Sequence, residues 1–327
     1  MSDICNCPHP TDKLTPLFSA RDHVTGERFT VGYCARCKLH VTSPTPTEAE
    51  IARYYPPAYY GNGRRFAYVV EWLLSIIYRY RVWEMERRQP PGKALDIGCG
   101  RGLMLHRLRS HSWQVQGTEL SEGAAAYARD ALRIPITVGK LHDAHFPDAE
   151  FDLIIMWHVI EHLHNPREVL AEVRRILKPG GRLLLAAPNF GSWEARWGRE
   201  DWFHLDVPKH LTHFTPKSLK RLLREAGFRV ERKSFFSTEY DFFTFAQTAL
   251  NKLGFPYNRL YNMLRTQSAR MNEHVDSKRS ALASLAEDAL MLCCAAPLLA
   301  AGMVIAPFAA ALDKGATFAL IALKPKD

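Results

Sequence analysis

The alternation of short apolar runs with helix-forming segments, which begins at Lys93, constrains the fold of this chain more than any other feature. Apolar runs of this length predict buried strands, and the segments between them carry helical periodicity. Strands that alternate with helices form a parallel sheet covered by helices on both faces. We therefore expect an α/β fold with strands at 94–97, 113–120, 134–138, 151–156, 182–187 and 228–234.

Helix boundary signals between these strands support the same pattern. Asn165 and Pro166 supply an N-cap and a first-turn proline, and Glu168 completes a capping box. A later helix is expected to open at Pro216 and to close at Gly227. The signals predict one helix before the fifth strand and one before the sixth.

A glycine turn follows the first expected strand, in the pattern Asp96-x-Gly98-x-Gly100-x-Gly102. Glycines at this place let the backbone approach a ligand, and the next helix points its N-terminus at that ligand. The turn departs from the dinucleotide pattern G-x-G-x-x-G, and an acid precedes it, which favours S-adenosylmethionine (SAM) over NAD. Glu119 ends the second strand, where a carboxylate can accept hydrogen bonds from both ribose hydroxyls.

Together these residues resemble those of class I SAM-dependent methyltransferases. The resemblance spans about residues 90–235 and continues through Phe151-Asp152, 158–163, 177–181 and 187–189. Within that family, the chain is similar to ubiquinone-type O-methyltransferases and to bacterial enzymes that carry an N-terminal zinc module and modify glycans or lipids. The resemblance implies a Rossmann-like seven-stranded sheet, whose last strand, expected at 317–323, runs antiparallel between the fifth and the sixth.

The resemblance also implies a cofactor site. Asp96 and the glycines would flank the methionine part of SAM, and Glu119 would hold the ribose. Leu120 and Leu141 would line the adenine, with Trp157 beneath the sulfonium. The predicted cofactor-binding set is Asp96, Gly98, Cys99, Gly100, Gly102, Glu119, Leu120, Leu141 and Trp157.

Three candidate acceptor-side residues, His158, Glu161 and His162, follow the fourth strand at a spacing that puts them on one helical face. One of them could remove the proton of a hydroxyl acceptor. In the ubiquinone enzymes the matching patch helps to hold a divalent metal, but its first position is an acid. His158 at that position argues against a catalytic metal here. The alternative is that Glu161 and His162 bond to backbone and shape the loop.

A second group of acceptor-side candidates lies at 202–214, where aromatic and imidazole side chains gather. This loop follows the fifth strand, near the carboxyl edge at which open α/β sheets bind ligands. Its rings suit a sugar or another ring-bearing acceptor. His210 ranks level with His162 as the base, although either histidine could be structural. No Asn-Pro-Pro-Tyr-like sequence follows the fourth strand, which disfavours nucleic acid as the acceptor.

Four of the seven cysteines lie within the first 45 residues. Cys5-x-Cys7 and Cys34-x-x-Cys37 have the spacing of two halves of a structural zinc site, which would staple a small N-terminal module. Because the first pair departs from C-x-x-C, His9 could replace one of its thiolates. Four thiols without metal are the alternative. The start of the chain has no secretory signal, so we expect a reducing cytosolic location and no disulfides.

An uncharged run of 24 residues, Ala289 to Leu312, is long enough to cross a bilayer of about 30 Å. A last strand that rejoins the sheet argues against a single crossing. Pro297 and Pro307 interrupt the helical pattern, so we predict a re-entrant or interfacial apolar hairpin, with 241–265 as an amphipathic companion. The alternative is a helical pair packed on its own protein or on a dimer partner.

The predicted domains are a zinc module at 1–45, a helical cap at 46–92, a SAM-binding core at 93–239, a helical insertion at 240–315 and the last strand at 316–327. The leading functional hypothesis is O-methylation of a glycan or lipid-linked acceptor, by an enzyme docked peripherally on the inner leaflet. C-methylation of a nucleotide-linked sugar is the second hypothesis, and it needs no lipid contact.

The net charge of +9 supports a third hypothesis, an RNA-binding protein or RNA methyltransferase. The basic residues of the chain cluster at 79–87 and 221–232. A solvated basic surface would account for the same charge.

Overall fold

The computed structural model describes residues 14–55, 68–237, 240–265 and 281–326, so the expected ligands Cys5, Cys7 and His9 lie outside the described residues. The chain divides into two compact units. The small-sheet unit is drawn from residues 1–59, 188–216 and 234–318, and the large-sheet unit from 60–187, 217–233 and 319–327. Each unit therefore combines segments that are distant in the sequence.

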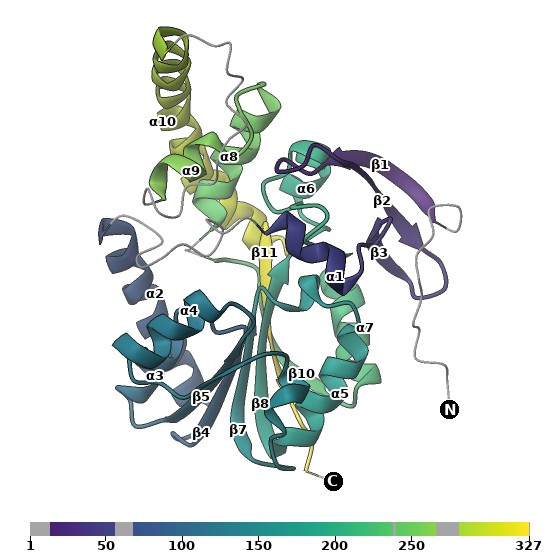
Figure 1. The fold of residues 1–327 in the computed structure, drawn as a ribbon, viewed down its shortest axis with the longest axis vertical. Helices are drawn as coiled ribbons and strands as arrows, with labels where there is room; N and C mark the ends of the chain where they lie inside the picture. The colour runs from purple at the N-terminus through teal and green to yellow at the C-terminus, as the bar shows by residue number, and fades with distance from the viewer. Residues whose placement is uncertain (1–13, 56–67, 238–239, 266–280, 327) are drawn as a thin grey trace. The chain divides into compact units, whose positions relative to one another are not determined.

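The large-sheet unit is built on a seven-stranded sheet with the order β10-β11-β8-β7-β4-β5-β6 (Figure 1). β4 pairs in parallel with both β5 and β7, and the pairs β5–β6 and β7–β8 are also parallel. This sheet confirms the predicted Rossmann-like fold. The strands are β4 (Lys93–Ile97), β5 (Gln114–Glu119), β6 (Ile136–Val138), β7 (Phe151–Trp157), β8 (Leu177–Pro188), β10 (Arg229–Ser234) and β11 (Thr317–Leu323).

The last strand enters this sheet in the opposite direction to its neighbour. β11 lies between β8 and β10. The amide of Asn189 donates to the carbonyl of Ala316 at 2.8 Å, and the amide of Gly180 donates to that of Lys324 at 2.8 Å. Residue numbers thus rise along β11 as they fall along β8, so the expected antiparallel seventh strand is confirmed.

β8 is longer than the expected strand, because it begins at Leu177 and not at Arg182. The amide of Lys324 donates to the carbonyl of Gly181, and its ammonium donates to the carbonyls of Arg174 and Leu177. Contacts with Lys324, which is distant in the sequence, therefore hold residues 178–181 in an extended conformation. Local turn signals do not reveal these contacts.

Helices cover both faces of the large sheet, with α2, α3 and α4 on one side and α5 and α7 on the other (Figure 1). Val82 of α2 and Leu105 of α3 share a buried core with Leu153 and Ile321 of the sheet. The helices and short turns are α2 (Tyr68–Glu86), α3 (Leu103–Arg109), α4 (Glu122–Ala126), η4 (Tyr127–Ala131), η5 (Leu141–Ala144), η6 (Ile160–His162), α5 (Pro166–Ile176) and α7 (Pro216–Glu225).

The predicted N-cap and first-turn proline of α5 are confirmed, whereas Glu168 bonds to the side chain of Asn165 in place of the expected capping-box bond to its backbone. The Asn165 side chain accepts from the amide of Glu168, and its own amide group donates to the Glu168 carboxylate at 3.0 Å. Pro166 occupies the first turn, where a backbone amide would have no intrahelical acceptor. The missing N–H of proline therefore costs no helical hydrogen bond. Local capping interactions therefore account for where this helix begins.

The small-sheet unit contains a four-stranded sheet in the order β1-β2-β3-β9. β9, which comes from the 202–214 segment, pairs His213 with His40 and Thr212 with Val41 of β3. These strands are β1 (Thr15–Arg21), β2 (Arg28–Cys34), β3 (Leu39–Ser43) and β9 (Thr212–His213), and the short helices beside them are α1 (Glu48–Ile51), η2 (Ala52–Tyr54), α6 (Trp193–Gly198) and η7 (Arg199–Asp201).

The core of the small sheet is shared between an N-terminal segment and a central segment of the sequence. Phe29 and Val31 of β2 pack in one buried cluster with Trp202 and Val207. The small-sheet unit therefore does not end at residue 45, where the sequence analysis placed the boundary of the N-terminal module. The N-terminal strands bury their apolar face against a segment that the sequence analysis assigned to the methyltransferase core.

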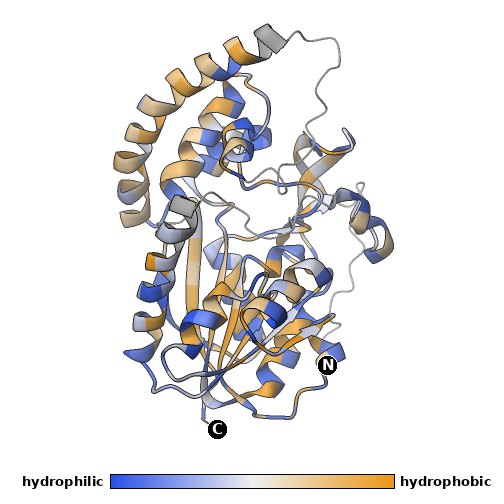
Figure 2. Cartoon of the chain, turned by 60° about the vertical axis from the view of Figure 1, so that its left-hand side comes forward, coloured by the Kyte–Doolittle hydropathy of each residue, from blue (hydrophilic) through white to orange (hydrophobic). Residues whose placement is uncertain are grey.

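The described residues of the insertion before β11 form the helices α8 (Asp241–Lys252), α9 (Arg259–Leu264) and α10 (Ala281–Ala311). The prediction of an apolar hairpin was wrong, because α10 is one helix of 31 residues that contains both Pro297 and Pro307 (Figure 2). Both prolines are exposed, and a helix can pass through a proline with a bend when packing supports it.

Packing against α8 supplies that support. Met291, Ala295, Ala306 and Ala309 are buried along one side of α10. At Gly302 a Cβ would lie 2.5 Å from the carbonyl oxygen of Phe242, so the two helices approach closely there. Leu285–Ala311 is long and apolar enough to cross a membrane, with a mean hydropathy of 2.3 and only 22% of its most apolar window buried.

Candidate cofactor and acceptor sites

The glycine turn after β4 adopts a backbone that only glycine accepts easily. Gly98, Gly100 and Gly102 have φ angles of 67°, 54° and 69°. A Cβ at Gly98 would also lie 2.7 Å from a methyl carbon of Val159. The amides of Gly98 and Cys99 donate to the carbonyl of Thr118 at 2.8 and 3.1 Å. The turn is thus hydrogen-bonded to the end of β5, and its three glycines form a cradle in which the backbone is open to a ligand.

Glu119 at the end of β5 binds the same turn through its side chain. One carboxylate oxygen accepts from the amide of Gly100 at 2.8 Å, and the other accepts from the amide of Ser121 at 2.8 Å. The side chain is buried, at 7% exposure. Because a carboxylate offers about four lone-pair sites, these two bonds leave acceptor capacity for a pair of hydroxyl groups.

Asp96 is the second acid of this site and is 5% exposed. Burial, and secondarily the negative charge of Glu119, raise the pKa of Asp96 to about 8, although Arg81 acts in the opposite direction. A cation placed nearby would favour the ionised carboxylate. SAM carries a sulfonium and an ammonium group, so a buried acid beside an open glycine cradle fits this cofactor.

Arg81 is a residue of this region that the sequence analysis did not assign. It lies on α2, and its guanidinium carbon is 3.4 Å from the centre of the Trp157 ring at the end of β7. Trp157, expected beneath the sulfonium, thus has one ring face covered by a cation. The basic cluster at 79–87 was the available signal, but it did not indicate which arginine turns inward.

The two leucines expected at the adenine have different environments. Leu120 follows β5 and is 66% exposed, whereas Leu141 begins η5 and is buried at 4%. The amide of Gly139 donates to the carbonyl of Glu119 at 3.0 Å, which ties the segment before η5 to the end of β5. Their contact with adenine stays a prediction.

His158 and Glu161 form a close pair after β7. Nδ1 of His158 lies 3.1 Å from Oε1 of Glu161, which is 1% exposed. His158 has a φ of 55°, a left-handed conformation that is unusual outside glycine. The expected helical face is instead a single short turn, η6, which carries Glu161 and His162 and is preceded by His158.

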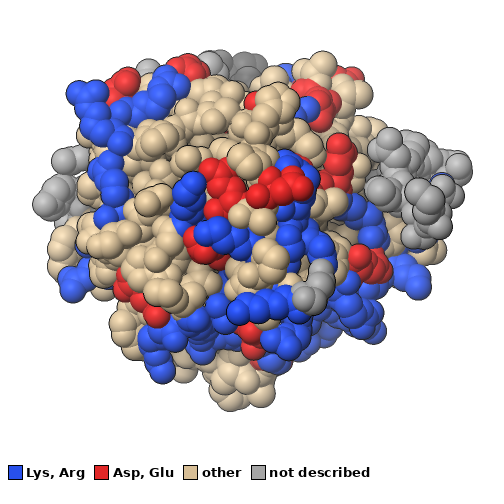
Figure 3. Space-filling view, turned by 90° about the horizontal axis from the view of Figure 1, so that it is seen from below, with Lys and Arg blue, Asp and Glu red and all other residues tan. Residues whose placement is uncertain are grey.

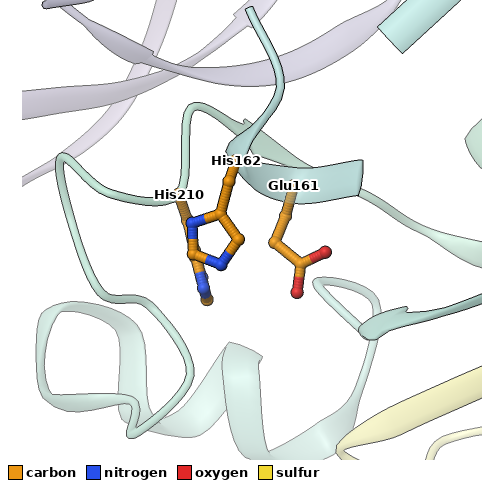
Figure 4. A group of neighbouring side chains, drawn as sticks. All are labelled: Glu161, His162 and His210. Atoms are coloured by element: carbon orange, nitrogen blue, oxygen red, sulfur yellow. The ribbon is translucent and has the colours of Figure 1, made fainter. Parts of the chain in front are cut away.

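Figure 4 draws Glu161 and His162 on this turn, and His210 on the loop that precedes β9. His210 belongs to the small-sheet unit and is 8% exposed. Its Nδ1 lies 2.8 Å from the carbonyl oxygen of His204. A carbonyl can only accept, so Nδ1 carries the hydrogen and Nε2 of a neutral His210 carries the basic lone pair.

The backbone around His210 is held by a buried threonine. Thr42 donates its hydroxyl hydrogen to the carbonyl of His210 at 2.7 Å, and Nε2 of His213 lies 2.9 Å from the same hydroxyl. Burial lowers the pKa of His213 well below its ordinary value. His213 is therefore a neutral structural histidine, whereas His210 has the fixed tautomer that a base requires.

The second half of the expected zinc site lies at the turn between β2 and β3. Cys34 and Cys37 are both buried there. The amide of Lys38 donates to the carbonyl of Cys34 at 2.7 Å, and Lys38 has a φ of 57°. This tight turn brings two thiols to the end of a hairpin, which suits a pair of zinc ligands.

Basic and acidic side chains alternate on the face of the molecule in Figure 3. Within the large-sheet unit, Arg229 and Arg232 form ion pairs with Glu231 and Glu84. Other pairs there are Arg167–Glu225, Arg175–Asp148, Lys178–Asp152, Arg182–Glu231 and Arg221–Glu225. The basic cluster at 221–232 is therefore largely paired with acids, which weakens the hypothesis that it binds RNA.

Comparison with known proteins finds similarity over the central region of the chain. Residues 76–233 match the family model described as a methyltransferase domain. A probable S-adenosylmethionine-dependent methyltransferase of Mycolicibacterium smegmatis is 32% identical over 138 residues, which cover 42% of this chain and 52% of the relative. A ubiquinone biosynthesis O-methyltransferase of Azoarcus sp. is 32% identical over 150 residues, 41% of this chain and 63% of that enzyme.

The chain thus spans about half of the length of the first curated relative it matches. Among solved structures, the cyclase SpnF covers 86% of this chain at a TM-score of 0.51 and 19% identity. That likeness concerns the fold alone, because one fold can host unrelated chemistries. The assignment of the central region therefore rests on the family model and on the cofactor-site residues.

Proposed function

We propose, on the premise that residues 76–233 are a class I SAM-dependent methyltransferase domain, that this protein transfers the methyl group of SAM to a hydroxyl group of a lipid-linked or glycan acceptor at the inner surface of a membrane. One observation carries the choice of acceptor. The small-sheet unit exposes a long apolar helix, α10, whose outer face contains Leu290, Met303, Val304 and Phe308 at 59%, 59%, 73% and 62% exposure.

The cofactor part of the proposal rests on the large-sheet unit. The glycine cradle and Glu119 would hold SAM, which supplies a methyl group on a sulfonium with a neutral thioether as leaving group. Asp96 would ionise as the positive charges of the cofactor arrive, and its carboxylate would then stabilise them. Since the leaving group is already good, alignment of the acceptor supplies most of the rate acceleration.

The acceptor part of the proposal gives the chain one further task, removal of the hydroxyl proton. His210 is the favoured base, because its Nδ1 bond to the His204 carbonyl leaves Nε2 as the basic nitrogen. His162 is the competing candidate, since it lies on the exposed side of η6 at intermediate burial while Glu161 is buried. A catalytic divalent metal has no role in this proposal.

Membrane docking follows from the chemistry of the α10 surface. Soluble monomers rarely expose contiguous apolar patches of more than a few hundred Å². On α6 of the same unit, Trp193 and Trp197 are 38% and 44% exposed, and Trp193 contacts Phe308 at 5.9 Å between ring centres. Tryptophan is enriched where proteins meet the lipid–water interface. Because one side of α10 packs on α8, we propose that it lies in the membrane surface.

A structural zinc ion is the last part of the proposal. Cys34 and Cys37 would supply two of its ligands, and Cys5 with Cys7, or His9 in place of one of them, would complete a four-coordinate site. Such a site has no open position, so its function would be to hold the N-terminal strands together.

The test uses purified full-length protein, SAM with a labelled methyl group, and a host cell extract that contains membranes. Label is then measured in organic-extractable, small aqueous and RNA fractions. We expect it in the organic fraction, or in a glycan attached to a membrane carrier. Label confined to nucleotide sugars or to RNA would overturn the acceptor assignment, and no label with intact SAM binding would overturn methyl transfer itself.

A further inference from the structure

The small-sheet unit contains an apolar cavity of about 210 Å³ between α6, α8 and α10. Its walls are formed chiefly by Trp193, Trp197, Phe245, Ile305, Ala306 and Ala309. For comparison, an engineered apolar cavity of about 150 Å³ stays dry and binds small hydrocarbons. The space is thus large enough for part of a hydrocarbon chain, and its lining is chiefly apolar.

The cavity opens into the apolar surface described above. Trp193, Trp197 and Ile305 line it, and each is also more than a third exposed. Trp197 stacks on Phe245 at 5.9 Å, so the aromatic rim continues into the wall. A chain that enters from a lipid layer against α10 would therefore meet apolar side chains along its whole path.

The two acids of the cavity are occupied by the protein. The Glu194 carboxylate accepts from the hydroxyls of Thr244 and Thr248 at 3.1 and 2.8 Å. Asp241 accepts from the amide of Ser237 at 2.9 Å and from the hydroxyl of Thr317 at 3.1 Å. Burial raises the pKa of Glu194 to about 8, so this carboxyl group is mainly neutral at physiological pH. These groups do not make the cavity a cation site.

Lys314, just after α10, is the cationic residue of the lining. Among the described residues, no carboxylate forms an ion pair with it. Its backbone is fixed, because its carbonyl accepts from the amide of Trp193 and its amide donates to the carbonyl of Ala309. The lining therefore combines apolar walls with one cationic residue, Lys314, while its two acids accept hydrogen bonds from the protein itself. An anionic amphiphile is complementary to this combination.

We propose that this cavity binds one hydrocarbon chain of an anionic membrane lipid, with the ionised headgroup beside Lys314. The inference rests on the proposed function only in its choice of a membrane as the source of the ligand. It adds a defined lipid site to a surface that would otherwise adsorb to bilayers without specificity.

The experiment measures binding of lauroyl lysophosphatidylglycerol below its micelle concentration, by native mass spectrometry and calorimetry on the full-length protein. Ala309→Leu places extra carbon atoms in the cavity, and Ala300→Leu adds the same atoms to the exposed side of α10. We expect Ala309→Leu to weaken binding about tenfold or more and Ala300→Leu to leave it unchanged. Equal affinity in both variants would overturn the site.

A second measurement needs no variant that could misfold. Lysophosphatidylglycerols of increasing chain length should gain about three- to fourfold in affinity per methylene until the cavity is full, and then no more. The matching lysophosphatidylcholine should bind more weakly, and Lys314→Gln should remove that preference. Affinity independent of chain length, or no headgroup preference, would reject the assignment.

The outcomes separate this inference from the proposed function. If labelled methyl groups appear in lipid while Ala309→Leu binds the lysolipid normally, only the cavity assignment fails. Conversely, if the lysolipid binds as expected but label stays in aqueous or RNA fractions, the cavity assignment stands and the acceptor assignment fails.

Discussion

The carboxylate of Glu119 accepts a hydrogen bond from the amide of Gly100 at 2.8 Å, so the end of β5 holds the glycine turn that follows β4. The two residues are 19 positions apart in the chain. The acid expected to bind the cofactor ribose thus also shapes the cradle. Loss of this carboxylate should affect the cofactor site twice, through the ligand contact and through the turn.

The first prediction concerns this carboxylate. Glu119→Ala removes the acceptor of two backbone amides and the expected ribose partner, so SAM affinity should fall by about 100-fold or more, measured by calorimetry. Glu122→Ala is the matched control, because Glu122 is exposed and pairs with Arg129 at the surface. Wild-type affinity in the Glu119 variant would remove this residue from the site.

The catalytic base is tested by the second prediction. His210→Asn keeps a side-chain hydrogen-bond donor but has no basic nitrogen, so turnover should fall by about 10² to 10⁴ while SAM affinity stays unchanged. His162→Asn, measured beside it in kcat and in SAM binding, decides between the two candidates. Full activity in both variants would mean that neither histidine removes the proton.

A third prediction concerns stability and pH. The pKa of Glu194 is about 8 in the folded protein against an ordinary value of 4.5. The folded state therefore binds the proton of Glu194 more tightly than the unfolded state does. This difference stabilises the folded state fully below about pH 4.5, and the stabilisation is lost as the pH rises towards 8. Glu194→Gln cannot ionise and should lose less stability over this window. The loss of unfolding free energy over this window should differ between wild type and Glu194→Gln by a few kcal/mol, since one pKa unit corresponds to about 1.4 kcal/mol.

Urea unfolding at several pH values measures this difference. Glu200→Gln serves as the control, because Glu200 is exposed and its variant should follow the wild-type pH profile. Parallel profiles for wild type and Glu194→Gln would show that the buried carboxyl group does not titrate in this window.

The fourth prediction tests the zinc site. Protein purified without chelator should contain about one zinc ion per chain, and Cys34→Ser or Cys37→Ser should lose it and melt at a lower temperature. Cys293→Ser, which changes an exposed thiol on α10, should keep the metal. Metal analysis by mass spectrometry reads both results. Wild-type protein without zinc would favour the alternative of four unmetallated thiols.

Membrane docking is the subject of the fifth prediction. Val304→Asp and Phe308→Asp put a charge on the exposed face of α10, so co-sedimentation with vesicles that contain anionic lipid should be lost. Leu17→Asp makes the same change at an exposed apolar residue of β1 and should have no effect. If the α10 variants instead turn a dimer into a monomer, measured by analytical ultracentrifugation, the face is an interface between copies.

Local chemistry explains what was predictable from the sequence. The glycine turn after the first strand of the sheet and the N-cap at Asn165 are short patterns whose conformations depend on neighbouring residues, and both are found as expected. The predicted contacts of Asp96 and Glu119 with the cofactor stay predictions. The strand–helix alternation indicated the sheet, because each strand must be apolar to be buried on both faces. Only the ends of elements shifted, as at Leu177.

Long-range contacts account for what was missed. The sequence by itself determined the α/β fold and the glycine turn after β4, since these patterns are local. Only the tertiary structure decided that Arg81 stacks on Trp157, that β9 completes the N-terminal sheet, and that α10 continues through two prolines. Each of these depends on burial against a partner distant in sequence, and the free energy of such burial is not encoded in any short pattern.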